Sequence, residues 1–255
     1  MMKQFITLIF LIPFILSAQT KNDKDVIRKV EDNGPDGMTI NYRLDDVHEH
    51  EVKKDGKTFT RLMINGFSHL HENGLPALPS GRDMVLIPEN GSATIEIQTI
   101  KTDTIKNILV FPSQPLQPDG YDGKERENPA EEISKENREF TYNATFYNQD
   151  QYAPEKVVKI NQEQKIRDLS VGIIRVTPFK YNPAKRELVI IRELDYEVVF
   201  HGADKYFDNI SQYSLQYLQT LPEKFLNSRS ISKEIEKSSG RTSKSKDADY
   251  LIVNH

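Results

Sequence analysis

The 255-residue sequence contains no cysteine and no tryptophan. Without cysteine the chain can form no disulfide, offers no thiol nucleophile and cannot bind a metal through thiolates. The absence of tryptophan counts against carbohydrate binding, because glycan-binding modules tend to expose rows of aromatic rings. A domain of this size must therefore be held together by an ordinary hydrophobic core.

The chain also lacks the short motifs of several enzyme classes. It has no Gly-x-Ser-x-Gly nucleophile elbow, no phosphate-binding loop and no His-Glu-x-x-His metal helix. Its net charge of −4 makes it a poor candidate for nucleic-acid binding. We therefore expect no catalytic residue, no cofactor and no nucleic-acid partner for this chain.

The N-terminus carries a single long apolar run, and no later segment is apolar enough to span a bilayer. Lys3 precedes this run, which extends from residue 5 to residue 16 and ends in small residues at Ala18. A transmembrane helix needs about 20 apolar residues, more than this run provides. The pattern is typical of a secretory signal peptide, residues 1–18, cut between Ala18 and Gln19. We expect a protein that is secreted or held at the cell surface.

The rest of the sequence is rich in strand patterns. Apolar and polar side chains alternate over residues 38–44, 93–97 and 196–200, as in half-buried strands. Residues 169–200 contain an Asn-Pro turn signal and predict one long hairpin. Residues 208–226 change to a helical period. The sequence thus predicts a mainly β protein, an antiparallel β-sandwich with short helical additions.

Two polar stretches flank the predicted sandwich, which spans residues 38–227. Residues 19–37 end in a turn-rich segment and predict a flexible lead-in. Residues 228–247 contain seven serines and six basic residues, which is typical of a solvated linker open to proteases. Beyond it, residues 250–253 form an unalternating apolar run, typical of a strand buried on both faces of a parallel sheet.

Three motifs, in this order, resemble the N-terminal propeptide of gingipain-type cysteine peptidases. They are Gly74-Leu75-Pro76-Ala77-Leu78-Pro79 with a strand ending in Ile87-Pro88, Arg167 with Val176-Thr177-Pro178 and Tyr181-Asn182-Pro183, and Tyr250-Leu251-Ile252-Val253. The prolines of the first motif predict a stiff, extended connector. The resemblance implies a propeptide domain over residues 38–227, a processing linker over 228–247 and the start of a truncated caspase-like peptidase domain at 248–255.

The resemblance also implies a function. In this family the prodomain packs against the peptidase of the same polypeptide, assists its folding and keeps it latent, and a loop enters the active-site cleft. Residues 112–138 have the length and exposure for such a loop. We predict Arg126 as the inhibitory residue, with Lys124 as second choice, because a basic side chain can pair with a pocket carboxylate. Arg241 is the preferred processing site, with Arg229 as the alternative.

Other interpretations stay open on the sequence alone. The chain could be a secreted β-sandwich binding or adhesion module, or a stand-alone peptidase inhibitor, although the apolar run at its end argues against the latter. His48 and His50, like His69 and His71, are two residues apart and could chelate zinc from one face of a strand. We interpret them as exposed polar residues and predict no metal site.

Overall fold

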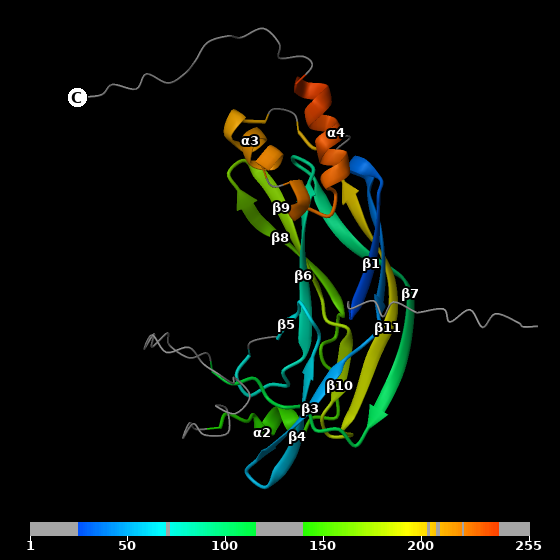
Figure 1. The fold of residues 1–255 in the computed structure, drawn as a ribbon, viewed down its shortest axis with the longest axis vertical. Helices are drawn as coiled ribbons and strands as arrows, with labels where there is room; N and C mark the ends of the chain where they lie inside the picture. The colour runs from blue at the N-terminus through cyan, green and yellow to red at the C-terminus, as the bar shows by residue number, and fades with distance from the viewer. Residues whose placement is uncertain are drawn as a thin grey trace, which may run out of the picture.

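The computed structural model describes residues 25–69, 72–115, 140–202, 205–207, 210–220 and 222–239. All pairings between its named strands are antiparallel, and the few helical segments are short, so the predicted antiparallel β-sandwich is confirmed (Figure 1). No helix among these residues is both long and apolar enough to cross a bilayer. Several predicted sites lie outside the described residues: Ala18, Gln19, Lys124, Arg126, Arg241 and the apolar run 250–253.

The larger sheet has β11 at its centre. Its five strands are β1 (Val26–Asp32), β2 (Gly37–Leu44), β7 (Ser92–Lys106), β10 (Phe179–Asn182) and β11 (Glu187–His201). β7 pairs with β11 along its whole length, whereas β2 and β10 pair with separate halves of it. A short 3₁₀ helix, η1 (Gly34–Asp36), joins β1 to β2.

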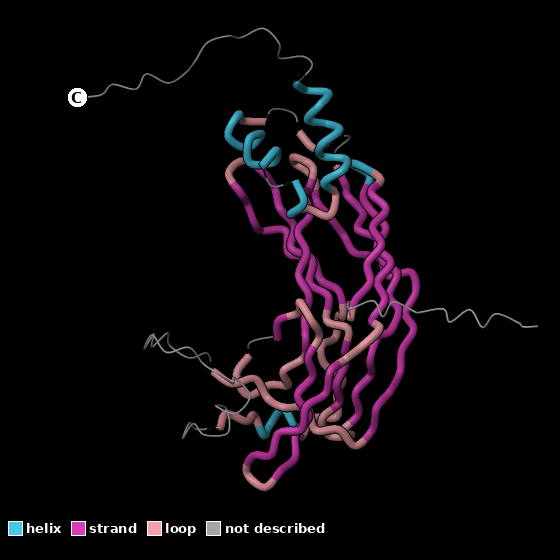
Figure 2. The backbone as a smooth tube through the Cα atoms, viewed as in Figure 1, coloured by secondary structure: helices cyan, strands magenta, loops and turns pink. Residues whose placement is uncertain are grey.

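The smaller sheet packs against the larger one, and a separate hairpin projects from one end. The smaller sheet has the order β5 (Ser68–His69), β6 (Pro79–Ile87), β9 (Leu169–Val176) and β8 (Val158–Ile166), and the hairpin consists of β3 (His48–Lys54) and β4 (Lys57–Met63). The remaining helical elements are α2 (Ala144–Tyr147), α3 (Gln212–Thr220), η2 (Pro222–Lys224) and α4 (Ser228–Ser239). Figure 2 shows that α3 and α4 cap one end of the sandwich, while α2 lies at the opposite end.

A continuous hydrophobic core lies between the sheets. Ile40 and Tyr196 face each other in the register of β2 and β11, and both are fully buried. Ile174 of the smaller sheet is also fully buried and belongs to the same cluster. The alternation predicted over residues 38–44 and 196–200 therefore marks the core face of two neighbouring strands.

The prediction of one long hairpin over residues 169–200 is wrong. Strand β9 belongs to the smaller sheet, where it pairs with β6 and β8, and the chain crosses to the larger sheet near Pro178. Proline has no N–H to donate to a strand ladder, but its carbonyl accepts a hydrogen bond from the Ile191 N–H at 2.9 Å. The hairpin in this region consists of β10 and β11 alone.

The prediction of a flexible lead-in over residues 19–37 is wrong for its described part, which contains β1. Along β1, Arg28 lies opposite the buried Tyr42, at a position where an apolar side chain would be expected. Its guanidinium forms an ion pair with Asp83 of β6 in the other sheet. Arg28 therefore interrupts the apolar alternation by which the strand could have been predicted. Its partner Asp83 comes from a distant part of the chain.

The prediction of a linker over residues 228–247 is wrong for its first half, which forms α4. Ile231 and Ile235 lie one turn apart and are 1% and 7% exposed, so they bury one face of the helix. The Asp32 carboxylate accepts hydrogen bonds from the Ser230 N–H at 2.9 Å and the Ser230 hydroxyl at 2.7 Å. This contact satisfies an N–H of the first helical turn.

Candidate functional site: the base of the predicted loop

Two described segments lie at the two ends of the predicted loop 112–138, and we call them together the loop base: residues 111–115, where the loop begins, and residues 140–143, which follow it. The side chain of Gln114 joins them, because its Nε2 donates to the Thr141 carbonyl and its Oε1 accepts from the Thr141 N–H, both at 3.0 Å. The side-chain amide thereby takes the place of a peptide group in a two-bond pairing. The two segments of the loop base are therefore held side by side.

The Gly-Leu-Pro connector supports both halves of the loop base. Gly74 N–H donates to the Ser113 carbonyl and Ser113 N–H donates to the Leu75 carbonyl, each at 2.7 Å. The Gly74 carbonyl accepts from the Asn143 N–H at 3.1 Å, so one glycine contacts both segments. Gly74 has a φ of +80°, and a Cβ at this position would lie 3.0 Å from the Asn143 nitrogen. The motif therefore requires glycine here for both conformation and space.

Aromatic rings pack beneath the loop base. Phe59 of β4 contacts the rings of Phe111, Phe140 and Tyr142, with centroids 5.8, 5.5 and 6.1 Å away. Tyr142 in turn stacks on Tyr147 of α2 at 4.4 Å. Such offset and edge-to-face contacts add about 0.5–1.5 kcal/mol per pair beyond simple burial. Both segments of the loop base therefore rest on one aromatic cluster.

Backbone pairing and a buried hydroxyl fix this cluster to the sandwich. Thr60 N–H donates to the Leu109 carbonyl at 2.7 Å, and Phe111 N–H donates to the Thr60 carbonyl at 2.8 Å. The Tyr147 hydroxyl donates to the Val110 carbonyl at 2.7 Å. Burial raises the pKa of Tyr147, so the hydroxyl remains a protonated donor at all physiological pH values. The base is thus a preorganised platform.

The structure gives two other basic residues of the sequence analysis clear positions. Arg229 is exposed in the first turn of α4, at the end of the sandwich opposite the loop base (Figure 1). Arg167, from the second motif, has a φ of +59° in the turn between β8 and β9. Its guanidinium donates to the Tyr213 carbonyl and lies 5.8 Å from the centre of the Tyr217 ring. Arg167 therefore links α3 to the smaller sheet.

The histidines have separate partners. His48 Nε2 lies 3.0 Å from the buried carboxylate of Asp25, and His69 Nε2 lies 2.8 Å from the Leu62 carbonyl. Asp25, Asp46 and His48 place possible ligand atoms within 4.8 Å of one another. That group differs from the histidine pairs considered in the sequence, and His71 lies outside the described residues.

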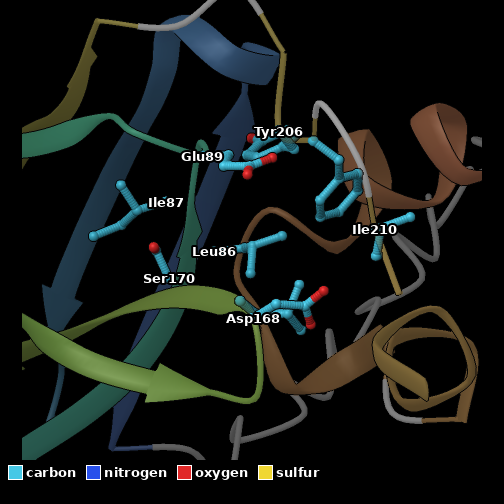
Figure 3. Close-up of a pocket in the computed structure, with 9 residues that line it drawn as sticks. Leu86, Ile87, Glu89, Asp168, Ser170, Tyr206 and Ile210 are labelled. Atoms are coloured by element: carbon cyan, nitrogen blue, oxygen red, sulfur yellow. The ribbon is translucent and has the colours of Figure 1, made fainter. Parts of the chain in front are cut away.

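A small cavity lies at the other end of the molecule, beneath the helical cap (Figure 3). Its lining includes Leu86, Asp168 and Tyr206. Its volume of about 10 Å³ is enough for roughly one water molecule. Hydrogen bonds from the Ser214 hydroxyl and the Ser211 N–H outweigh the opposing effect of burial and lower the pKa of Asp168. This carboxylate is satisfied within the fold, and the cavity is too small for a substrate.

Comparison with known proteins identifies the family. Residues 17–212 match the family described as Propeptide_C25. The chain belongs to this family. It is 21% identical over 190 residues to Lys-gingipain of Porphyromonas gingivalis, a match that covers 74% of this chain and 11% of that protein. Gingipain R1 of the same organism is 21% identical over 173 residues, which cover 68% of this chain and 16% of that protein.

Two solved structures share the fold of this Propeptide_C25 chain. The complex of the Porphyromonas gingivalis RgpB pro- and mature domains matches with a TM-score of 0.64 and 19% identity, over 79% of this chain and 97% of that one. A structure on the zymogenic latency of gingipain K matches with a TM-score of 0.57 and 17% identity, over 72% and 96% of the two chains. The chain spans about a tenth of the length of Lys-gingipain.

The sequence predicted a loop between these two segments, which stays a prediction, but it did not point to the residues that join them. Gln114 and Thr141 are 27 positions apart in the sequence, and a lone glutamine beside prolines carries no signal of pairing. The first motif gave a better signal, since Gly74 precedes a proline pair. Its extended geometry was predicted, and Pro76 indeed pairs with Pro112 in an antiparallel bridge.

Proposed function

We propose that this chain is the secreted propeptide of a gingipain-like cysteine peptidase and that it keeps that peptidase latent until the two are separated by cleavage. Membership of the Propeptide_C25 family supports the proposal, as do two neighbours of the same fold that are described as a pro- and mature-domain complex and as a latent zymogen. The chain itself supplies no thiol nucleophile. The peptidase domain of the same polypeptide is the proposed partner.

The inhibitory loop rises from the loop base, with Arg126 in the S1 pocket of the peptidase and Lys124 as second choice. The observation that carries this proposal is the double hydrogen bond between Gln114 and Thr141. A loop whose ends are already fixed loses less entropy when it enters a cleft. An extended segment can then pair with backbone groups of the cleft, while the guanidinium forms a charge-assisted pair with a carboxylate.

A trans-inhibition assay tests this assignment. The chain without residues 1–18 is mixed with the mature peptidase encoded in the same gene, and the inhibition constant is measured for the parent and for Arg126→Ala. We expect the inhibition constant of Arg126→Ala to be at least thirtyfold higher, since a buried charged anchor typically contributes about 2 kcal/mol or more to binding. Arg82→Ala, an exposed arginine of β6, is the control. If Arg126→Ala inhibits as well as the parent, then either Lys124 occupies the S1 pocket or this segment is not the inhibitory loop.

Processing is proposed at Arg241. A peptidase binds its substrate as an extended chain, and Arg229 lies within α4, so cleavage there would first require unwinding the helix. Mass spectrometry of the secreted product of the full-length gene gives the new N-terminus. We expect it at residue 242, and an end within residues 228–239 would show that α4 opens. The same experiment locates signal cleavage, proposed between Ala18 and Gln19.

A further inference from the structure

The β3–β4 hairpin separates its charges between two faces. Directly opposed residues of an antiparallel pair share a face. One face carries four opposed pairs, His48 with Met63, His50 with Arg61, Val52 with Phe59 and Lys54 with Lys57. The hairpin itself therefore places only basic and apolar side chains on this face, and Asp25 from outside the hairpin contacts His48 at its end. The other face carries Glu49, Glu51 and Lys53, which lie opposite Leu62, Thr60 and Thr58. We call His50, Lys54, Lys57 and Arg61 the basic face.

Like charges lie directly opposite each other on this face. A two-residue turn at Asp55 and Gly56, with φ values of +49° and +71°, fixes Lys54 opposite Lys57. Such a pair is destabilising within the isolated chain. A single-residue slip of register would separate the lysines but would move the fully buried Phe59 to the other face. The fold thus keeps the two lysines opposed, and no carboxylate among the described residues forms an ion pair with either of them.

The basic face lies beside the loop base. Arg61 Cζ is 4.8 Å from the centre of the Phe111 ring, and Lys57 Nζ is 4.4 Å from the centre of the Tyr142 ring. One cation therefore covers the first segment of the loop base and the other covers the second. The buried Phe59 lies between them on β4. Figure 1 shows the hairpin at the same end of the sandwich as α2.

The Arg61 guanidinium is partly desolvated without a counter-charge. Burial lowers the pKa of Arg61, and no carboxylate among the described residues forms an ion pair with it. Other arginines of the sandwich do have such partners, as Arg28 does with Asp83 and Arg192 with Asp103. A desolvated cation is costly unless a carboxylate pairs with it. The ring of Phe111 offsets only part of that cost.

We propose that the basic face binds carboxylates on the rim of the peptidase cleft that receives the loop. This inference rests on the proposed function and names a second contact for the same partner. A cleft that accepts a basic side chain is acidic, so cations on both sides of the loop base match it in charge. Electrostatic attraction by these cations accelerates the association of the chain with the peptidase. Arg61 then forms an ion pair with a carboxylate of the rim once water is excluded.

The test compares binding of the mature peptidase to Lys57→Met/Arg61→Met and to Lys53→Met. Lys53 is an exposed lysine of the same hairpin, but it lies on the opposite face. Methionine retains much of the apolar stem, so folding should be preserved, which the melting temperature checks. We expect each cation removed to weaken binding of the peptidase about tenfold, so that the double variant binds about a hundredfold more weakly than the parent. Its association rate should also depend less on salt concentration. Lys53→Met should bind like the parent, and equal affinity of all three proteins would overturn the proposal.

A loop-deleted variant separates docking from an indirect effect on the loop. Because Gln114 and Thr141 are hydrogen-bonded, residues 116–139 can be replaced by a short Gly-Ser bridge. We expect this variant to retain weak binding that Lys57→Met/Arg61→Met weakens further. If the substitutions matter only when the loop is present, the cations act through the loop and the proposal is wrong. If the parent chain itself does not bind the peptidase, the proposed function fails first.

Discussion

The two ends of the sandwich are stabilised by different chemistry. At the capped end, buried polar side chains satisfy one another. Asn227 is fully buried, accepts from the Leu86 N–H at 3.1 Å and donates to the Leu86 carbonyl at 2.8 Å and the Tyr206 hydroxyl at 2.9 Å. At the loop base, aromatic packing and backbone pairing dominate, and the cations that lie over the rings form no ion pair with a carboxylate of the described residues.

This difference separates a structural end from a binding end. Polar groups that are fully satisfied inside the fold stabilise it and leave nothing for a partner to contribute. Cations around a rigid platform that have no ion-pair partner among the described residues are stabilised when a partner protein supplies carboxylates. We therefore expect substitutions at the capped end to change stability alone, and substitutions at the loop base to change inhibition more than stability.

Asn227→Leu should produce the largest effect on stability. It leaves the backbone groups of Leu86 and the hydroxyl of Tyr206 without their buried partners. We expect the free energy of unfolding to fall by about 3 kcal/mol, measured by urea denaturation. Inhibition per folded molecule should not change. A loss below about 0.5 kcal/mol, or a specific loss of inhibition, would contradict the comparison.

Gly74→Ala against Gly66→Ala sharpens the comparison at the loop base. Both glycines have a φ of +80°, but a Cβ at Gly66 meets nothing within 4 Å, whereas at Gly74 it crowds Asn143. In both variants the free energy of unfolding should fall by about 1 kcal/mol because alanine is strained at this φ. Gly74→Ala should lose about 1 kcal/mol more and inhibit several-fold more weakly. Equal behaviour of the two variants in both assays would show that the connector does not support the loop.

Gln114→Leu removes the closure of the loop base while keeping its apolar stem. We expect about 1 kcal/mol of lost stability and a five- to tenfold weaker inhibition constant. Gln98→Leu on the exposed β7 is the matched control and should change neither quantity. If Gln114→Leu loses stability but inhibits as well as the parent, preorganisation of the loop ends is not part of the mechanism.

The smallest effect concerns pH at the capped end. The folded pKa of Asp168 is lower than its ordinary value of 3.8 because the ionised carboxylate accepts hydrogen bonds from Ser214 and Ser211. The contribution of Asp168 to the free energy of unfolding is therefore present above pH 4 and is lost as the pH falls through the pKa that Asp168 has in the folded state. In Asp168→Asn the stability should fall less steeply between pH 4 and pH 3. An unchanged slope in denaturation at these pH values would contradict this assignment.

The sequence reveals those parts of the fold that depend on local patterns. The alternation in residues 38–44 marks a core strand, and the Gly-Leu-Pro connector follows from the properties of glycine and proline alone. Strand β1 and helix α4 depend instead on distant partners. Arg28 interrupts the apolar pattern of β1 and pairs with Asp83 of the other sheet, and the Asp32 carboxylate accepts an N–H of the first turn of α4. Such contacts have no signature in a single sequence.

The candidate site shows the same limit. The loop and its basic residues stay predictions from the sequence, and the hydrogen bonds that join Gln114 to Thr141 at its base had no signal there. The basic face was hidden because the segment HEHEVKKDGKTFTR carries charges of both signs. Only the register of β3 with β4 shows that His50, Lys54, Lys57 and Arg61 share one face, while Glu49 and Glu51 lie on the other face with Lys53.

Hydrogen exchange of the whole chain, with and without the mature peptidase, tests the difference between the two ends most directly. The account predicts slower exchange on binding in the β3–β4 hairpin and in residues 109–115 and 140–147, with no change in residues 205–239. Protection confined to the capped end, or no protection at the loop base in a complex that forms, would contradict it.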